Sequence, residues 1–397
     1  MTMITDSDAL AAFCRRQAEA DFIAVDTEFM RDTTYWPKLC LAQIAGPDEA
    51  AAIDTLAPDI DLAPMFDLMK NKKILKVFHS ARQDVEIFFL LMDCLPEPIF
   101  DSQVAAMVCG FGDSVGYDTL VRKLTGTRID KSSRFADWAH RPLKRRQIDY
   151  ALSDVTNLRP VYKKLRRRLE KNGRIAWLDE EMALLTNPET YRLEPRTAWR
   201  RLKTRSSDPR YLALLAALAQ WREREAQRRD VPRNRVLRDE QMFDIAAHRP
   251  ATPEELARTR GLSHDAARGR IGQAILEAVR AGLAVPDADC PTAPPRAERA
   301  AGVGPVMDLL KVLLKMRCEA HGVATKLVAN TADLEAIAAD DEAPVLALQG
   351  WRREIFGADA LALKHGQLGL AVENRKIRVV PLIGPERPAK TPHAKAS

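Results

Sequence analysis

Short, mainly apolar runs alternate with segments of helical periodicity over the first 110 residues of the chain. Runs of four to six such residues, bounded by polar or turn-forming residues, are typical of β-strands, and they fall at Phe22–Val25, Leu39–Ile44, Ala50–Ile53 and Ile74–Phe78. Apolar side chains at helical spacing predict a helix over Ala81–Leu91 that packs on these strands. Strands that first follow one another closely along the sequence, and then alternate with helices, indicate a mixed sheet flanked by helices.

Helical periodicity dominates the rest of the chain. A long helix is predicted from Pro142 to about Lys171, because proline is well tolerated in the first helical turn, and Asn172–Gly173 is a typical helix stop. Prolines at positions 188 and 195 then interrupt the pattern. The amphipathic segments that follow predict a compact all-α unit, with helices over Tyr211–Arg229, Asp239–Ala247, Pro253–Ala257 and Ser263–Arg280.

A second helical unit is predicted after a linker. Several prolines between Ala281 and Ala301 indicate that this segment is the linker. The polar, proline- and lysine-rich end of the chain from Pro385 is predicted to be disordered. Between them, helices are expected over Val306–Ala320, Thr331–Ala339, Trp351–Phe356 and Ala358–Leu363.

The composition fits a globular protein of two or three domains. The 397 residues are 46% hydrophobic and 29% charged, which excludes a disordered or fibrous chain. No apolar run approaches the ~18–20 residues that a membrane span needs, and Met1–Leu10 lacks the features of a signal peptide. The six cysteines are scattered without a C-x-x-C pair, so we expect a reducing cytoplasm rather than a zinc site or a disulfide framework.

Charge is divided unevenly along the chain, although the net charge is only +6. Residues 1–140 carry 14 Lys and Arg against 22 Asp and Glu, whereas residues 141–240 carry 26 against 14. An acidic block followed by a basic one fits an enzyme that holds cations in one region and a polyanion in the next, because clustered Lys and Arg attract phosphate backbones. Solvated helix faces explain any single basic cluster equally well.

Two carboxylates, Asp26 and Glu28, stand at the end of the first predicted strand. Residues i and i+2 of a strand point to the same side, so both carboxylates project together. Adjacent carboxylates repel unless a cation lies between them, and hard oxygen ligands suit Mg²⁺ or Mn²⁺ rather than zinc. Taken alone, the pair is more readily explained as a surface feature.

Further acids follow apolar runs or lie on predicted helices. Asp84 comes after an apolar strand, near the first turn of the next helix, and Asp101 directly follows another apolar run. Tyr150 and Asp154 are four residues apart on the long helix, so the phenol and the carboxylate share one face. Each has an ordinary explanation, as a helix-dipole partner, a core residue or a solvated acid. Together they form the DEDDy pattern.

With this pattern the chain resembles the DEDDy 3′→5′ exonucleases, and within them the ribonuclease D family. The exonuclease motifs are matched by Val25–Phe29, Ala81–Asp84 and Tyr150–Asp154. Trp36 stands where the family often has Tyr, and Ser102 where it often has Thr. The chain has no G-x-x-x-x-G-K-[ST] loop, which excludes an HRDC-bearing helicase. Further segments similar to ribonuclease D are Tyr35–Leu39, Phe100–Gln103, Asp130–Ser132, Asp137–Trp138 and Arg141–Leu143, and segments similar to its HRDC domain are Trp221–Glu223, Asp230–Arg233 and Val236–Glu240.

The resemblance implies a fold and a division into domains. We expect an α/β part, a ribonuclease H-like mixed sheet flanked by helices, followed by two small all-α bundles, an HRDC domain and an HRDC-like domain. The second bundle resembles the family only in length and helicity. The expected boundaries are 1–190 for the exonuclease domain, 203–283 for the HRDC domain, 284–302 for the linker, 303–382 for the second bundle and 385–397 for the tail.

The resemblance also implies the chemistry of phosphodiester hydrolysis with two divalent ions, Mg²⁺ or Mn²⁺. Asp26, Glu28 and Asp154 are expected to hold the first ion, Asp26 to bridge to the second, and Asp84 to bind the second. Tyr150 is expected to orient the attacking water, since a phenol with a pKa of ~10 is a weak general base. Asp101 is expected to support the site rather than to bind metal.

Other residues are candidates for binding substrate. Phe29 and Met30 follow the first acids, where they either wedge against the terminal base or pack in the core. Thr27 and His79 are further candidates, although a histidine at a strand end is more often a structural hydrogen-bonding residue. The residues of the basic helix that would follow a phosphate backbone are Lys163, Lys164, Arg166, Arg167 and Arg168.

The function that the resemblance implies is a metal-dependent 3′→5′ exoribonuclease. Such an enzyme shortens RNA from the 3′ end, releases 5′-nucleotides and matures tRNA precursors and other small structured RNAs. We expect a cytoplasmic monomer with no membrane partner. Two alternatives stay open: a DNA 3′→5′ exonuclease, which would differ in its response to the 2′-hydroxyl, and a non-catalytic RNA-binding scaffold, against which the presence of all four acids and the tyrosine argues.

Overall fold

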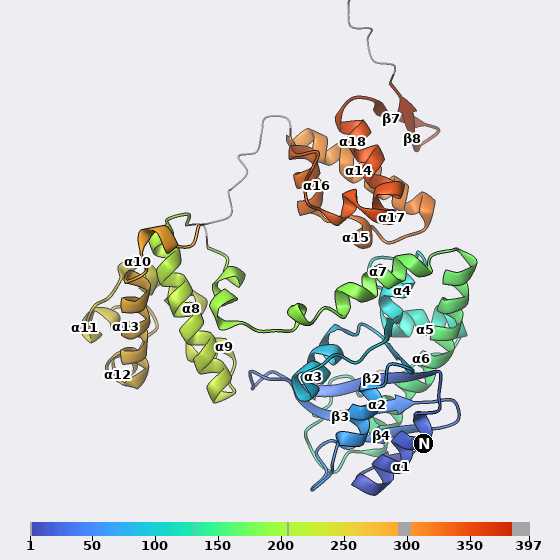
Figure 1. The fold of residues 1–397 in the computed structure, drawn as a ribbon, viewed down its shortest axis with the longest axis horizontal. Coiled ribbons are helices and arrows are strands. Elements are labelled where there is room, and N and C mark those ends of the chain that lie inside the picture. The colour runs from blue at the N-terminus through green and yellow to red at the C-terminus, as the bar shows by residue number, and fades with distance from the viewer. Residues whose placement is uncertain (1, 131, 205, 293–302, 383–397) are drawn as a thin grey trace, which may run out of the picture. The chain divides into compact units, whose positions relative to one another are not determined.

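The computed structural model describes residues 2–130, 132–204, 206–292 and 303–382 (Figure 1). The predicted tail, and residues 293–302 of the predicted linker, lie outside these ranges. The chain forms two compact units. The first contains the described parts of Met1–Asp101, Ile129–Pro160 and Met182–Arg296, and the second those of Ser102–Arg128, Val161–Glu181 and Ala297–Ser397.

A six-stranded mixed sheet lies in the first unit, in the strand order β1-β4-β3-β2-β5-β6. β3 pairs antiparallel with both β2 and β4, whereas the β1–β4, β2–β5 and β5–β6 pairs are parallel. This topology confirms the mixed sheet that the sequence predicted. The strands span Thr2–Ile4 (β1), Phe22–Met30 (β2), Lys38–Ala45 (β3), Ala50–Ile53 (β4), Leu75–Phe78 (β5) and Ile99–Asp101 (β6).

Both faces of the central strands are covered. Every residue of β3 after Lys38 is buried, which explains why this strand is apolar along almost its whole length. α1 and α2 pack against each other, and α3 follows β5. The residues of α6 up to Pro160 also belong to this unit. These helices span Ser7–Gln17 (α1), Ala63–Lys70 (α2), Arg82–Met92 (α3) and Arg145–Lys171 (α6).

An arginine joins the segment before α6 to the sheet. The pairing of β2 with β3 shifts register after Glu28, and Cys40 is the extra residue of the resulting bulge. The Cys40 carbonyl accepts a hydrogen bond from Arg141 Nη2 at 2.7 Å. The same guanidinium donates to both carboxylate oxygens of the buried Asp54, at 2.6 and 2.8 Å. A bidentate arginine–carboxylate pair fixes both the orientation of the guanidinium and its distance from the carboxylate. This contact therefore sets where α6 begins.

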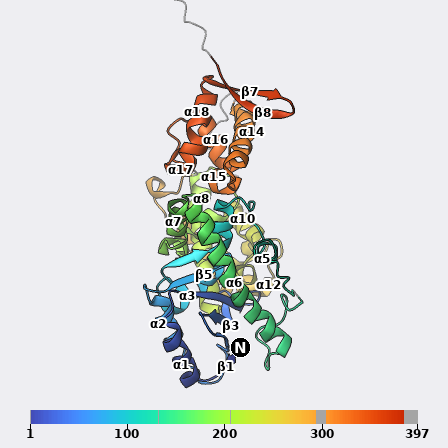
Figure 2. The same cartoon turned by 90° about the vertical axis from the view of Figure 1, so that its right-hand side faces the viewer.

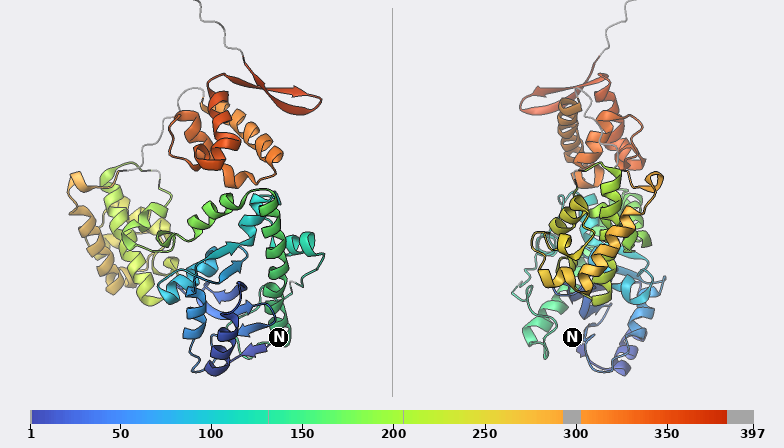
Figure 3. Two further views of the ribbon diagram at one scale, coloured as in Figure 1. Left: turned by 45° about the vertical axis from the view of Figure 1, so that its right-hand side comes forward. Right: turned by 90° about the vertical axis from the view of Figure 1, so that its left-hand side faces the viewer.

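The first helical bundle completes this unit (Figure 3). Its core contains Leu215, Leu218 and Ile275. α8 and α13 approach so closely that a Cβ at Gly282 would lie 2.8 Å from Leu214 Cα, so only glycine fits there. The elements are the 3₁₀ turns Pro188–Thr190 and Pro195–Arg201, then Pro209–Arg229 (α8), Arg233–Val236 (α9), Asp239–His248 (α10), Pro253–Leu256 (α11), His264–Arg268 (α12), Arg270–Leu283 (α13) and the 3₁₀ turn Asp287–Asp289.

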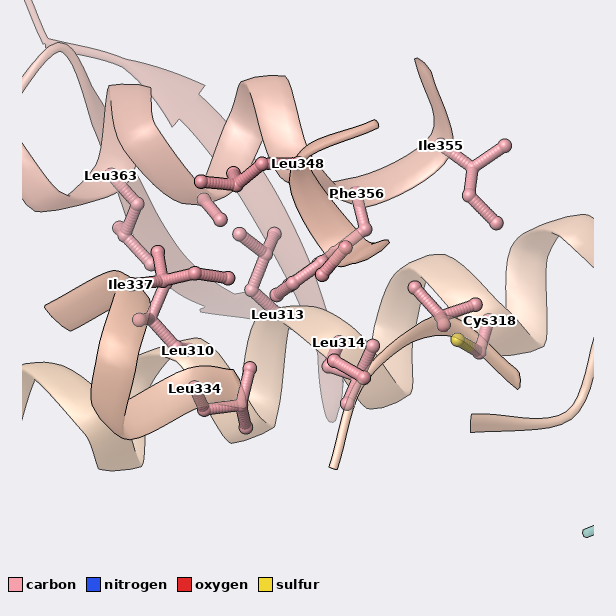
Figure 4. Packing of buried hydrophobic residues seen from close by; sticks show 14 of the residues in the cluster. Leu310, Leu313, Leu314, Cys318, Leu334, Ile337, Leu348, Ile355, Phe356 and Leu363 are labelled. Carbon is pink, nitrogen blue, oxygen red and sulfur yellow. The ribbon is translucent and has the colours of Figure 1, made fainter. Parts of the chain in front are cut away.

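The second helical bundle belongs to the second unit, and its core is drawn in Figure 4. Leu310 and Leu313 of α14 face Leu334 and Ile337 of α16 across this core, and Phe356 fills its centre. The elements of the unit are Ser102–Val108 (α4), Tyr117–Thr125 (α5), Ile175–Leu185 (α7), Val303–His321 (α14), Thr325–Val328 (α15), Thr331–Ala339 (α16), the 3₁₀ turn Leu346–Leu348, Gly350–Arg352 (α17), the π-helical turn Arg353–Gly357 and Ala358–Lys364 (α18).

Helix α7 and this bundle are in direct contact. The rings of Trp177 and Trp351 are stacked, with centroids 4.3 Å apart and planes 10° apart. The buried Arg352 donates to Glu180 Oε2 at 3.1 Å and to Glu181. These contacts pack α7 against the second bundle within this unit.

A β-hairpin that the sequence did not predict ends the described chain (Figure 2). It consists of β7 (Leu368–Glu373) and β8 (Lys376–Pro381), which pair antiparallel. The turn residues Asn374 and Arg375 have φ angles of 50° and 61°. The apolar alternation is short and the turn lacks the glycine that usually marks a two-residue hairpin turn, so the pattern gave no strand signal.

The other differences concern element boundaries and further elements that were not predicted. β1, α1, α2, α4, α5 and α7 were missed, whereas the long helix runs from Arg145 to Lys171, close to its predicted range. The segment predicted as Ser263–Arg280 is divided at Gly269 into α12 and α13. The six cysteines are all free thiols. None of the helices in the described part of the chain is both long enough and apolar enough to cross a bilayer.

Candidate active site

Asp26 and Glu28 project from the same side of β2. Both are partly exposed, and they flank the buried Thr27, as the alternation of side chains along a strand requires. β2 lies between β3 and β5, so the two carboxylates stand at a central strand of the sheet. The sequence therefore predicted correctly that they lie on one face.

Asp84 reaches the same region from α3. It lies in the first turn of that helix and is 6% exposed. The Thr27 hydroxyl donates a hydrogen bond to Asp84 Oδ1. This contact joins β2 to α3 directly beside the first two acids. The hydroxyl of Thr27, a candidate for substrate binding, thus has a carboxylate of the chain itself as its partner.

Asp101 supports the start of the helix that carries Asp84. Its carboxylate accepts hydrogen bonds from the backbone N–H groups of Ser80, at 2.9 Å, and Ala81, at 2.8 Å. Ala81 is the N-cap of α3, where backbone N–H groups lack partners within the helix. These contacts favour the interpretation of Asp101 as a supporting residue.

Tyr150 and Asp154 come from α6, one helical turn apart. The Tyr150 hydroxyl is hydrogen-bonded to the Asp154 carboxylate. The centroid of the Tyr150 ring lies 6.2 Å from that of Trp138. Ala151 and Val155 are fully buried, so core packing fixes the rotation of the helix and with it the direction of the two polar side chains.

Burial raises the pKa values of all four acids, and repulsion by neighbouring acids raises those of Asp26, Glu28 and Asp84 further. Burial is the largest cause, and it raises the pKa of Glu28 to about 9 and that of Asp154 to about 7. Burial and then repulsion by Asp154 raise the pKa of Asp26 well above its usual value, and burial and then repulsion by Asp26 do the same for Asp84. The pKa of Tyr150 is raised by burial and by the acids, which keeps the phenol protonated. The five groups thus lie within electrostatic reach of one another.

The donor set suits a hard divalent cation. Within the described ranges, no group of three or more Asp, Glu, His or Cys side chains is already arranged so that it could hold a metal ion. The four convergent groups are nevertheless all carboxylates, whose oxygens are the preferred ligands of Mg²⁺ and Mn²⁺. A cation among them would cancel the repulsion that raises their pKa values. The residues therefore fit the predicted metal chemistry.

The apolar and histidine candidates lie near the acids along the chain. Phe29 and Met30 form the end of β2 just beyond Glu28, and both are partly exposed. His79 directly follows β5 and is also partly exposed. Their predicted role in substrate binding stays a prediction.

The basic candidates occupy the second half of α6. Lys163, Lys164, Arg167 and Arg168 are exposed. Lys164 Nζ donates to the Leu124 carbonyl at 2.6 Å. Arg166 is partly exposed and pairs with Glu170 at 2.7 Å, and Arg168 lies over the Phe111 ring at 4.9 Å. Of these, Lys163 and Arg167 are both exposed, and they are the positions used below to test RNA binding.

The sequence named Asp101 as a supporting residue, but it did not identify the other contacts that hold the acids in place. Arg141 was recognised only as part of a family segment, and its partner Asp54 was not singled out, because the two are 87 residues apart. The roles of Thr27 beside Asp84 and of Asp101 at Ser80 also depend on contacts between segments that are far apart in the chain. For the pair of Arg141 and Asp54, the sequence offered only two signals: an acid directly after β4 and an arginine shortly before α6.

Two family models match parts of the chain. A family model described as 3′-5′ exonuclease matches residues 1–170. A model described as HRDC domain matches residues 211–279. The first range contains the four acids and Tyr150, and the second lies within the first helical bundle.

Similar proteins cover almost the whole chain. Ribonuclease D of Granulibacter bethesdensis is 52% identical over 380 residues, which is 96% of each chain. Ribonuclease D of Nitrobacter hamburgensis is 52% identical over 377 residues, 95% of this chain and 98% of the relative. The crystal structure of Escherichia coli RNase D, described as an exoribonuclease involved in structured RNA processing, superposes with a TM-score of 0.80 at 31% identity, and covers 91% of this chain and 98% of that one.

Without divalent metal, the free energy of unfolding of the protein should fall as the pH rises. The folded state keeps the protons of Glu28 and Asp154 up to about pH 9 and 7, whereas their ordinary pKa values are 4.5 and 3.8. The unfolded chain therefore binds fewer protons than the folded protein in this range, and the free energy of unfolding falls as the pH increases. Thermal unfolding of EDTA-treated protein between about pH 5 and pH 9, with and without Mg²⁺, measures this: the stabilisation by Mg²⁺ should grow with pH.

Asp26→Asn is the test variant, and Asp32→Asn is its matched control. Asp26→Asn removes one of the repelling charges and should raise the melting temperature of the metal-free protein at high pH while it abolishes the effect of Mg²⁺. Asp32 is exposed and lies in the loop after β2, so Asp32→Asn should change neither quantity. A metal-free protein that becomes more stable across this pH range would contradict the analysis.

Proposed function

The chain belongs to the ribonuclease D family and is a 3′→5′ exoribonuclease, and we propose that Asp26, Glu28, Asp84 and Asp154 hold two divalent ions, Mg²⁺ or Mn²⁺, at its active site. The observation that supports this most strongly is the convergence of four carboxylates from β2, α3 and α6 on one another. When bound, two such ions lower the pKa of the attacking water and stabilise the leaving 3′-oxygen.

Asp26 is the residue best suited to contact both ions. Repulsion by Asp154 is the largest charge effect on Asp26, and repulsion by Asp26 is the largest charge effect on Asp84. The charge of Asp154 thus acts on Asp26 and the charge of Asp26 acts on Asp84, which supports contact of Asp26 with both ions. We propose that Asp26, Glu28 and Asp154 share one ion, and that Asp26 and Asp84 share the other.

Tyr150 orients the attacking water in this proposal. Its raised pKa keeps the phenol protonated, so the hydroxyl is a hydrogen-bonding group rather than a base. The hydrogen bond to Asp154 and the contact with Trp138 limit the rotation of the side chain. A hydroxyl held in this way beside a carboxylate of the site can fix the direction from which water attacks.

The substrates that we propose are tRNA precursors and other small structured RNAs with a single-stranded 3′ end. The E. coli relative is described as acting in structured RNA processing, which supports this class. The exposed basic residues on the second half of α6 supply the charge that a phosphate backbone requires. We further propose that the protein acts as a monomer in a reducing compartment such as the cytoplasm, which its six free thiols suit.

A structured RNA with a single-stranded 3′ extension, labelled at its 5′ end, should be shortened one nucleotide at a time in the presence of Mg²⁺. Asp26→Asn should lower kcat by about 10³-fold or more, as the loss of an essential catalytic group does. Tyr150→Phe removes only the hydroxyl and should lower kcat by about 10²-fold. The ladder of labelled products on a denaturing gel measures both effects.

A DNA strand of the same sequence is the substrate control, and Asp32→Asn is the control variant. Cuts at internal positions would contradict the exonuclease mechanism. Equal rates on the DNA would favour the alternative of a DNA exonuclease. Full activity of Asp26→Asn would remove this residue from the active site.

Lys163→Gln and Arg167→Gln should weaken the salt dependence of RNA binding. Each phosphate contact with single-stranded RNA contributes about 0.7 to the slope of log K against log salt concentration, so each lost contact should reduce the slope by that amount. Titrations at several salt concentrations measure it, with Arg15→Gln, an exposed position on α1, as the control. An unchanged slope in the double variant would exclude this part of α6 from the RNA-binding surface.

A further inference from the structure

The loop that follows Asp26 and Glu28 is held by the first helical bundle. This loop, residues 31–37, connects the end of β2 to the start of β3. Loops of this kind are usually among the more mobile parts of a domain, because few buried contacts hold them. Here the loop is anchored both to the bundle and to the helix that carries Asp84.

The first anchor is a buried hydrogen-bond network at Tyr35. The Tyr35 hydroxyl donates to Glu223 of α8. Arg233 of α9 donates to the same carboxylate through Nε and Nη2, both at 2.6 Å. Arg233 Nη2 also lies 3.1 Å from the Tyr35 hydroxyl oxygen, and Gln227 Nε2 donates to that oxygen at 3.2 Å. The bundle thus engages both the proton and the oxygen of this phenol.

Burial makes this network difficult to replace by water. Tyr35 is 7% exposed and Glu223 is 2% exposed. Burial by itself would raise the pKa of Glu223, but the hydrogen bonds from Arg233 and Tyr35 lower it below its usual value, so the carboxylate is ionised. A buried charge that loses one of its partners is strongly unfavourable. Tyr35, Glu223 and Arg233 are therefore expected to act as one unit.

A second contact with the bundle fixes the backbone of the loop. Asp230 Oδ1 accepts hydrogen bonds from the N–H groups of Tyr35 and Trp36, each at 3.0 Å. Asp230 is the residue at which α8 ends, and its φ of 48° turns the chain towards α9. The corner between α8 and α9 therefore holds both a side chain and two backbone groups of the loop.

The other end of the loop is joined to α3. Arg31 donates two hydrogen bonds to the carboxylate of Glu86, at 3.1 and 3.2 Å. Arg31 is three residues beyond Glu28, and Glu86 is two residues beyond Asp84. The loop thus connects the bundle with the strand and the helix that carry three of the four acids.

We propose that Tyr35, Glu223 and Asp230 are positioning residues through which the HRDC bundle fixes the end of β2, and with it the spacing between Glu28 and Asp84. This inference rests on the proposed function of the acids. It makes the bundle necessary for the turnover of every substrate, including an RNA too short to reach the bundle. A displacement of reacting groups by about 1 Å can lower a rate by about 10²-fold, so a small movement of the loop has a measurable effect.

The test compares Tyr35→Phe, Asp230→Gly and the double variant with the wild-type full-length protein. Tyr35→Phe removes the hydroxyl alone, and Asp230→Gly removes the carboxylate at a position where a positive φ suits glycine. Arg228→Gln on the same helix is the control, because Arg228 is exposed and its side chain pairs with Glu225. The measurements are kcat and KM for a trinucleotide RNA and for a long RNA, and the Mg²⁺ concentration that gives half-maximal activity.

The proposal predicts that kcat for the trinucleotide falls about tenfold or more in the double variant, and that the Mg²⁺ concentration for half-maximal activity rises, while Arg228→Gln behaves like wild type. Unchanged trinucleotide kinetics with a higher KM for the long RNA would overturn it, because the bundle would then only bind RNA. A lower melting temperature with unchanged kinetics would also overturn it. Failure of the proposed function would be distinct, since Asp26→Asn would then keep full activity on both RNAs.

Discussion

Carboxylates that are brought together away from water repel one another, and the described part of the first unit contains several devices that keep them together in spite of this. Asp26 and Glu28 are fixed by their positions on a central strand. Asp84 is held by the Thr27 hydroxyl, and the helix that carries it is capped by Asp101. Each contact opposes the separation that repulsion would otherwise produce, and a divalent cation would remove the repulsion itself.

The need to hold mutually repelling carboxylates together also explains the polar contacts of residues outside the acid cluster. Arg141 and Asp54 fix the start of α6, so Tyr150 and Asp154 approach the sheet in one register. Tyr35 and its partners in the first bundle hold the loop beyond the other end of the acid pair. In the second unit, the stacking of Trp177 on Trp351 joins α7 to the second bundle.

The sequence was most informative where chemistry and local periodicity coincide. The spacing of Asp26 and Glu28 on a strand, and of Tyr150 and Asp154 on a helix, was sufficient to predict which side chains share a face. The mixed sheet and the helices with strong amphipathic patterns were predicted for the same reason. The hairpin β7–β8 was not, because its alternation is short and its turn residues, Asn374 and Arg375, are not the usual ones.

The contacts that connect distant segments could not be predicted from one sequence. Tyr35 and Glu223 are 188 residues apart, and neither residue type indicates which residue it will contact. An isolated tyrosine in a loop and a glutamate on an amphipathic helix each suit an exposed position equally well. Only the fold brings them together, which is why the sequence identified the acids but not the residues that set their spacing.

Diffraction from crystals of the full-length protein soaked in Mn²⁺, with the anomalous signal of manganese recorded, tests the central claim most directly. The account predicts two manganese sites about 3.5–4 Å apart among Asp26, Glu28, Asp84 and Asp154, with Asp26 bound to both. Manganese bound elsewhere with no site among these four carboxylates would contradict it.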